Sequence, residues 1–329
     1  MFARTAITVR AAAAVLLLAL TGCGNAPDAV AAPGGPEGRL TLGFSQVGSE
    51  SGWREANTKS IQDAAAAAGV ELLFSNAQGS RDRQIEAIRS FIEQRVDVIA
   101  FSPVTETGWD PVLVEAREAG IPVILTDRAI QTSDSSLYRS FLGSDFIEEG
   151  TKAGTWLSDL YIAAKEPVSV VEIRGTENSA PAIERKLGFG AAIAQNPNLK
   201  IVASATGDFT RVGGKAVMED FLDSTPDIDV LYAHNDDMGL GAIEAIEEAG
   251  KVPGKDIVII TVDAVRDGMQ ALIDGKINYI VECNPLLGPQ LMELAKKILA
   301  GERVLQRVVT EETVFERSGA LAALPDRQY

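Results

Sequence analysis

The sequence contains very little cysteine and histidine, which narrows the chemistry that it could perform. Its 329 residues include 2 cysteines and 1 histidine. A nucleophilic serine or cysteine needs a base, and His234 is the single histidine that could serve as one. The chain also lacks a G-x-S-x-G nucleophile turn and a G-x-x-x-x-G-K-[ST] phosphate loop. Hydrolases with such nucleophiles and P-loop nucleotidases are therefore disfavoured, although a pair of carboxylates could still support glycoside hydrolysis.

Positive charge is also scarce. Lys and Arg number 30 against 46 Asp and Glu, which gives a formal net charge of −16. No basic stripe interrupts this balance, so we expect no nucleic-acid partner, because neutralising phosphates requires clustered Lys and Arg. The excess of acidic residues is typical of a soluble surface.

The sequence carries no recognisable metal or cofactor motif. His234, Asp236 and Asp237 lie close together, but their spacing matches no common metal-binding pattern. The two aspartates are better explained as acidic residues at the start of a helix, where they oppose the helix dipole. We therefore expect neither a metal nor a cofactor.

A hydrophobic run long enough to span a membrane is missing. The apolar run at residues 11–20 follows two arginines and is too short for a membrane helix, which is typical of a secretory signal. The sequence Leu-Thr-Gly-Cys that ends at Cys23 resembles a bacterial lipobox, which implies cleavage before this cysteine and its lipidation. We therefore expect a signal peptide at 1–22, a flexible tether at 23–38 and anchoring on the outer face of the cytoplasmic membrane. A plain secretory signal is the alternative. If Cys23 is lipidated, Cys283 is the one other cysteine, so no intrachain disulfide is expected.

Apolar runs alternate with helical segments through the rest of the chain. Near-continuous apolar runs predict strands buried on both faces, as in parallel sheets that are covered by helices. The predicted strands are 40–44, 71–75, 96–101, 122–126, 168–173, 200–205, 230–233, 257–262 and 278–281. The predicted helices between them are 53–68, 82–94, 110–119, 146–163, 180–194, 213–222, 238–249, 265–273 and 290–299. Because this rhythm occurs in two similar sets, it predicts an α/β protein with two doubly wound parallel-sheet lobes.

Several predicted strands run directly into polar side chains. These residues are Ser102, Asp127, Arg128, His234, Asn235, Asp263 and Glu282. In open α/β sheets, ligands bind just beyond the carboxyl ends of the strands. Donors and acceptors gathered there suit a small ligand that is rich in hydroxyl groups.

Two dipeptides carry groups suited to sugar recognition. Sugars are bound by an aromatic face against ring C–H groups and by bidentate polar groups on vicinal hydroxyls. Asp127-Arg128 places an acceptor beside a guanidinium. Trp53-Arg54 places an aromatic ring beside a second guanidinium, just after the glycine-containing turn at 48–52.

Four segments resemble a known family. Thr41–Arg54, Pro122–Arg128, Gly207–Arg211 and Tyr232–Met238 are similar to the ribose/galactose-type substrate-binding proteins of ABC importers, which have the periplasmic binding protein type I fold. Within this family the chain most resembles the galactofuranose-binding type. The resemblance extends from Arg39 onward and is most specific in the first segment.

The resemblance implies a set of ligand-binding residues. They are Trp53, Arg54, Ser102, Asp127, Arg128, Arg185, Phe209, Asn235, Asp263 and Glu282. In this family pattern Phe209 is the aromatic plate of the second lobe, and Glu282 lies at the hinge. Each residue also has a structural alternative: the aromatic residues could belong to the core, the arginines to surface ion pairs, and Asn235 and Asp263 to helix caps.

Two departures from the ribose-binding pattern bear on the ligand. Trp53-Arg54 stands where ribose binders carry two phenylalanines, so a charged donor replaces one stacking face. Glu282 stands where they carry glutamine. Both argue against ribose. The match to the galactofuranose type weakens after Pro285.

The resemblance also implies how the molecule works. Two lobes, at 39–143 plus 283–310 and at 144–282 plus 311–329, are joined by a hinge that the chain crosses three times. A monosaccharide binds between them, the lobes close, and an ABC permease with its ATPase receives the sugar. We expect a monomer without enzymatic activity. The alternatives are a ligand-binding subunit for a chemoreceptor or sensor kinase, or a binder of galactose, arabinose or ribose.

Overall fold

The computed structural model describes residues 39–329. The predicted signal peptide at 1–22, the lipidation site Cys23 and the tether at 23–38 lie outside the described residues. In the described part of the chain, no helix is long and apolar enough to cross a membrane.

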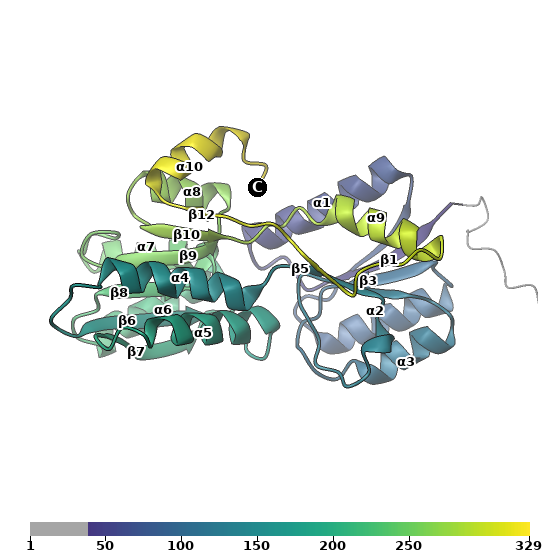
Figure 1. Cartoon of the computed structure of the whole chain (residues 1–329), viewed down its shortest axis with the longest axis horizontal. Coiled ribbons are helices and arrows are strands. Elements are labelled where there is room, and N and C mark those ends of the chain that lie inside the picture. Colours follow the sequence, from purple (N-terminus) through teal and green to yellow (C-terminus); the bar gives the residue numbers. More distant parts are fainter. Residues whose placement is uncertain (1–38) are drawn as a thin grey trace, which may run out of the picture. The chain divides into compact units, whose positions relative to one another are not determined.

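The first of two six-stranded sheets contains the strands labelled β1, β3 and β5 in Figure 1. Its spatial order is β11-β5-β4-β3-β1-β2. All of its neighbouring strands pair in parallel. Its strands are β1 (Thr41–Gln46), β2 (Glu71–Asn76), β3 (Val98–Phe101), β4 (Val123–Thr126), β5 (Ser140–Gly143) and β11 (Arg307–Val309).

The second sheet repeats the same plan with the order β12-β10-β9-β8-β6-β7. Its pairs are parallel except that β12 runs antiparallel to β10. Its strands are β6 (Val168–Arg174), β7 (Leu199–Thr206), β8 (Val230–Ala233), β9 (Val258–Asp263), β10 (Tyr279–Glu282) and β12 (Val314–Phe315). The predicted α/β class with two doubly wound lobes is therefore confirmed.

Helices cover both faces of the first sheet. One face carries α1 (Gly52–Ala68) and α9 (Gly288–Leu299), and the other carries α2 (Arg81–Glu93) and α3 (Asp110–Glu118). Side chains of β3 alternate between the two layers. Val98 and Ala100 pack with α1 and α9, whereas Ile99 and Phe101 pack with α2 and α3. This two-sided burial explains why the strand reads as a continuous apolar run.

The second sheet is covered in the same way. One face carries α4 (Phe146–Leu160) and α5 (Ala180–Ile193). The other carries α6 (Arg211–Ser224), α7 (Asp236–Glu248), α8 (Arg266–Ile273) and α10 (Arg317–Ala323). We call the elements around the first sheet the first lobe and those around the second sheet the second lobe.

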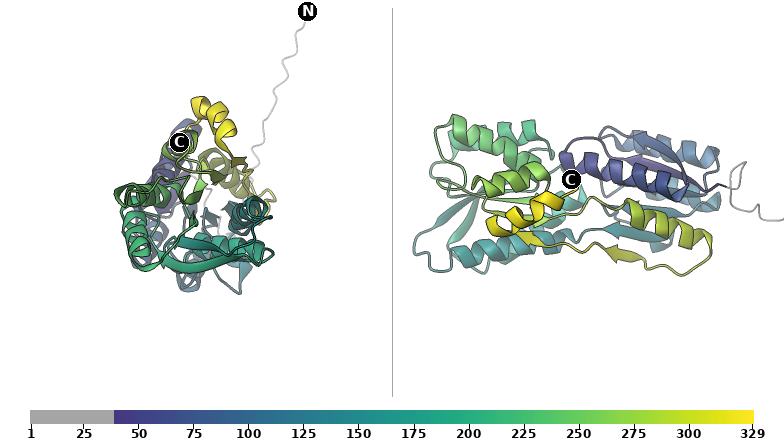
Figure 2. Two further views of the ribbon diagram at one scale, coloured as in Figure 1. Left: turned by 90° about the vertical axis from the view of Figure 1, so that its left-hand side faces the viewer. Right: turned by 90° about the horizontal axis from the view of Figure 1, so that it is seen from above.

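The chain passes between the lobes three times: after β5, after β10, and between β11 and β12 (Figure 2). Glu312 connects the three passages, because its Oε1 accepts hydrogen bonds from Ser144 Oγ, Asn284 N and Thr310 Oγ1. These hydrogen bonds connect the three crossing segments to one another, which is consistent with a single hinge region.

Candidate functional site

A small cavity of about 20 Å³ lies beyond the carboxyl ends of the strands of both sheets. Its lining residues are Glu50, Ser51, Trp53, Arg54, Asp127, Arg128, Phe146, Pro181, Arg185, Phe209, Asn235, Asp263 and Cys283. This free volume holds about one water molecule and lies well below the roughly 300 Å³ of a typical small-molecule site. The lining side chains therefore nearly fill the space between the two lobes.

The start of α1 brings two predicted residues to the cavity. Ser51 has extended backbone angles, and its Oγ accepts a hydrogen bond from Arg54 N at 3.2 Å, which caps the helix. Trp53 and Arg54 therefore lie in the first turn, and both are buried. Trp53 Nε1 donates to Cys283 O at 2.7 Å, so the indole ring is fixed to the hinge as well as packed against the core.

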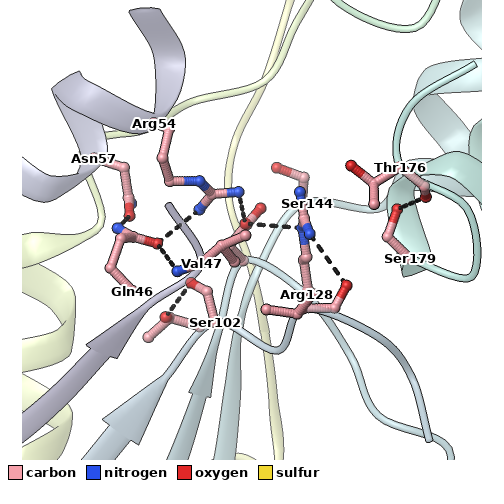
Figure 3. Close-up of polar contacts among 12 residues, drawn as sticks. Gln46, Val47, Arg54, Asn57, Ser102, Arg128, Ser144, Thr176 and Ser179 are labelled. Carbon is pink, nitrogen blue, oxygen red and sulfur yellow. Dashed lines mark hydrogen bonds and ion pairs between the residues drawn. The ribbon is translucent and has the colours of Figure 1, made fainter. Parts of the chain in front are cut away.

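Arg54 is fully engaged by protein groups. Its Nη1 donates to Gln46 Oε1 at 3.2 Å (Figure 3). Its Nη2 lies 2.7 Å from Asp127 Oδ2, and its Nε lies 3.1 Å from Glu50 Oε1. Burial acts to lower the pKa of Arg54, but the two carboxylates more than offset this and raise it. Burial likewise acts to raise the pKa of Glu50, and the adjacent arginines lower it. Arg54 therefore holds the two carboxylates in place.

Arg128 is buried but poorly paired (Figure 3). Its Nη2 lies 3.7 Å from Glu50 Oε1, its Nε lies 3.7 Å from Asp127 Oδ2, and its Nη1 donates a long bond of 3.4 Å to Val104 O. Among the described residues, Nε of Arg128 has no hydrogen-bond partner. Burial, with the nearby charge of Arg54, lowers the pKa of Arg128 to about 10, so the side chain stays protonated at neutral pH. Its unused donors can therefore serve a bound ligand.

Arg185 reaches the cavity from α5 and is held by the second lobe. Its Nε donates to Glu149 Oε2 at 2.7 Å and its Nη1 to His234 O at 2.5 Å. Its Nη2 lies 3.8 Å from Asp263 Oδ1, and the guanidinium lies 5.1 Å from the centroid of the Phe146 ring. Burial raises the pKa of Asp263 well above its usual value although Arg185 opposes this.

Phe209 supplies an aromatic face opposite Arg128, whose guanidinium carbon lies 5.4 Å from the ring centroid. The backbone of Phe209 has a φ of 62°, which is unusual for an aromatic residue. Its ring lies on Gly175, where an added Cβ would be 1.8 Å from the ring. Asn235 braces the same segment: its Nδ2 donates to Phe209 O at 3.1 Å while its Oδ1 caps α7. The predicted capping role of Asn235 therefore coexists with its place in the cavity wall.

Two predicted site residues do not line the cavity. The Oγ of Ser102 lies 3.0 Å from Thr126 Oγ1 within the first lobe. Glu282 instead bonds the end of the chain: its Oε1 lies 2.6 Å from Arg327 Nη1 and accepts from Tyr329 Oη at 2.9 Å. Both side chains have protein partners in this structure, and their place at the ligand site stays a prediction.

Five lining residues were not among the predicted contacts. They are Glu50, Ser51, Phe146, Pro181 and Cys283. The first two lie in the glycine-containing turn before α1, so proximity to Trp53 could have indicated them. Nothing in the local sequence marks Phe146 or Pro181 at the starts of α4 and α5.

The residues with metal-ligand chemistry are already engaged. His234 Nε2 lies 3.2 Å from Glu172 Oε1, Asp236 accepts from Thr261 Oγ1 and Val265 N, and Asp237 accepts from Gly52 N. Oxygen or sulfur atoms of Glu149, Cys283 and Glu312 lie within 4.8 Å of one another, and Cys283 is also a cavity residue. Glu149 is paired with Arg185, and Glu312 accepts the three hinge hydrogen bonds, so both carboxylates have structural roles.

The cavity lining is electrically balanced and amphipathic. It combines three arginines (Arg54, Arg128 and Arg185), three carboxylates (Glu50, Asp127 and Asp263) and three aromatic rings (Trp53, Phe146 and Phe209). Acceptors and donors of opposite formal charge favour a neutral ligand with many hydroxyl groups over an anion or a cation. The aromatic rings provide surfaces for its C–H groups.

A family model described as periplasmic binding protein domain matches residues 42–303. The chain belongs to this family. It is 43% identical over 305 residues to the galactofuranose-binding protein YtfQ of Escherichia coli, covering 92% of this chain and 93% of that protein.

Two solved structures are also similar. A crystal structure from Mycobacterium smegmatis in complex with β-D-fucofuranose is 66% identical, with a TM-score of 0.87, over 88% of this chain and 95% of the other. The second is the periplasmic binding component of an arabinose ABC transporter from Shewanella sp. ANA-3, bound to α- and β-L-arabinofuranose. It is 44% identical, with a TM-score of 0.85, and the match covers 88% of this chain and 96% of the other.

Proposed function

We propose that this protein is the sugar-binding component of an ABC importer and that its ligand is a monosaccharide in the furanose form, related to galactofuranose. The proposal is supported above all by Arg128, a buried guanidinium whose Nε has no partner among the described residues and which faces an aromatic ring. Hydroxyl oxygens of a sugar between the lobes would accept from these donors.

The other contacts of the proposed site follow from the cavity wall. Asp127 and Asp263 would accept from sugar hydroxyls, and Arg185 would donate from the second lobe. Phe209 and Trp53 would cover the apolar faces of the ring. The balanced charge of the lining argues for a neutral sugar rather than a sugar acid or sugar phosphate. The furanose form is suggested by the sugars bound to the two similar structures.

The wider mechanism also belongs to this proposal. The lobes, at 39–143 plus 283–310 and at 144–282 plus 311–329, would close on the sugar, and a permease with its ATPase would receive the closed form. Cys23 would carry the lipid anchor on the outer face of the membrane, with at least two acyl chains needed for stable anchoring. The protein would act as a monomer and release its sugar unchanged.

The test is calorimetric titration of the purified protein with a panel of monosaccharides. The panel contains galactofuranose, arabinose, galactose and ribose, and the recovered sugar is analysed after long incubation. We expect one tightly bound sugar per chain, with galactofuranose bound more tightly than ribose and recovered intact. No heat with any sugar would contradict sugar binding, and conversion of the sugar would indicate an enzyme.

A further inference from the structure

Asp237 connects the two lobes without lining the cavity. It belongs to α7 of the second lobe, and its Oδ2 accepts a hydrogen bond from Gly52 N of the first lobe at 2.8 Å. Gly52 is the first residue of α1, directly before the cavity residues Trp53 and Arg54. The bond therefore spans the cleft next to the proposed sugar site.

The carboxylate of Asp237 is shared by the N-termini of two helices. It lies in the first turn of its own helix, α7, and it also caps an N–H group at the start of α1. Both helix ends carry unsatisfied N–H groups and a partial positive charge, which a carboxylate stabilises. Its Oδ1 lies 3.5 Å from Arg211 Nη2 within the second lobe.

The contacts of Asp237 differ in whether they require the two lobes to be together. The interactions of Asp237 with α7 and Arg211 lie within the second lobe, so they persist when the lobes separate. The bond to Gly52 exists only while the lobes are together. A second hydrogen bond between the lobes, from Glu106 N to Asn178 O at 3.1 Å, involves backbone atoms and does not depend on Asp237.

We propose that Asp237 is a latch that favours the closed form and so raises the affinity for every sugar by the same factor without contacting it. This inference rests on the proposed function. The apparent affinity of a protein that must close depends on how readily it reaches the closed form, so a contact made only there acts on all ligands alike. Loss of one charge-assisted hydrogen bond of this kind should weaken binding about tenfold.

The first experiment compares Asp237→Ala with Asp267→Ala by calorimetry on two sugars that the wild-type protein binds. Asp267 is a matched control, because it also pairs with Arg211, at 3.1 Å, but has no bond to the first lobe among residues 39–329. We expect Asp237→Ala to raise the dissociation constants of both sugars by the same factor of about ten. Asp267→Ala should bind both sugars as the wild-type protein does.

The second experiment removes the donor instead of the acceptor. Gly52→Pro deletes the N–H group at a helix position that favours proline, and the preceding Ser51 has the extended angles (φ −149°, ψ 160°) that proline requires. Gly52→Ala keeps the N–H group, and its Cβ would lie at an ordinary distance of 3.6 Å from Asp237 Oδ2. We expect Gly52→Pro to weaken binding and Gly52→Ala to leave it nearly unchanged. In the Asp237→Ala background, Gly52→Pro should cause little further loss.

Three results would overturn the latch. Asp237→Ala could bind both sugars normally, it could change their ranking, or the two substitutions could act additively. If Asp237→Ala does not fold, as judged by thermal unfolding, Gly52→Pro and Gly52→Ala still decide the question. A wild-type protein that binds no sugar overturns the proposed function and the latch with it. That result comes from the wild-type titration alone and is distinct from any variant result.

Discussion

Replacing Arg128 by methionine should separate binding from stability. Among the described residues, the guanidinium of Arg128 has a hydrogen bond only with Val104 O, at 3.4 Å, and its contacts with Glu50 and Asp127 are both 3.7 Å long. Methionine keeps the aliphatic volume next to Phe209 but removes the guanidinium. Because Arg54 still neutralises both carboxylates, the free energy of unfolding should change by no more than about 1 kcal/mol.

The expected loss of affinity follows from the donors that Arg128 leaves unused. Nε and Nη2 make no hydrogen bond to protein within normal distances, so both are available to sugar hydroxyls. Hydrogen bonds from a charged donor contribute about 1.5–3 kcal/mol each. Two of them correspond to roughly 3–6 kcal/mol, or a dissociation constant raised by about 10²–10⁴.

Arg54→Met is the matched control for Arg128→Met. The same change at Arg54 removes contacts of 2.7 and 3.1 Å and leaves two buried carboxylates without their main partner. It should lower the free energy of unfolding by about 3–5 kcal/mol. Calorimetry gives the affinities, and urea unfolding without sugar gives the stabilities. The reasoning is refuted if Arg128→Met binds sugar normally, or if it destabilises the protein as much as Arg54→Met.

Three further outcomes are expected. Gly175→Ala should displace the Phe209 ring and weaken sugar binding. Gly190→Ala, with open space around the new Cβ, should leave sugar binding unchanged and be neutral or slightly stabilising. Equal sugar binding by the two variants would exclude Phe209 as the aromatic plate of the site. Burial raises the pKa of Glu149 from 4.5 to about 8, so the folded protein retains a proton that the unfolded chain has lost. Stability without sugar should therefore fall as the pH rises from about 4.5 to 8, and Glu149→Gln should flatten that part of the thermal-unfolding profile; an unchanged profile would refute the assignment. Glu282→Gln should lower the free energy of unfolding by about 1–2 kcal/mol, through weaker bonds to Arg327 and Tyr329, without changing the ranking of sugars in a calorimetric panel. An altered ranking would instead support a direct contact between Glu282 and the sugar.

The sequence predicts most of the sheet strands because they are buried on both faces and therefore apolar throughout. The strands that it does not predict are short or carry no such run. β5 contains a serine and a glycine, and β12 has two residues. These segments are strands because of their partners, β4 and β10, and not because of their own sequence.

The candidate site was predictable where a strand delivers a side chain directly into the cleft. Asp127, Arg128, Asn235 and Asp263 follow this rule, and all line the cavity. Glu282 also ends a strand, yet the next residue, Cys283, takes the place in the cavity wall. Glu282 is the last residue of β10, and successive side chains of a strand point to opposite faces, so Glu282 and Cys283 point apart. Asp127 and Arg128 can both line the cavity because Asp127, with a φ of 62°, is not extended.

The partners of Glu282 could not be foreseen from the local sequence. Arg327 and Tyr329 follow it by 45 and 47 residues, and they meet it only in the folded chain. The latch contact between Gly52 and Asp237 spans 185 residues and is equally invisible before folding. The contacts of Glu282 depend on packing within the second lobe, and the contact between Gly52 and Asp237 depends on how the two lobes are placed. No local sequence pattern encodes either.

The most direct test of the central claim is a crystal structure of the protein with the tightest-binding sugar of the calorimetric panel. The account predicts one sugar in the cavity between the lobes, with its hydroxyl oxygens within about 3.2 Å of Arg128 Nε and Nη2 and its ring against Phe209. A sugar bound elsewhere, or a sugar in this cavity that leaves the Arg128 donors unused, would contradict the account.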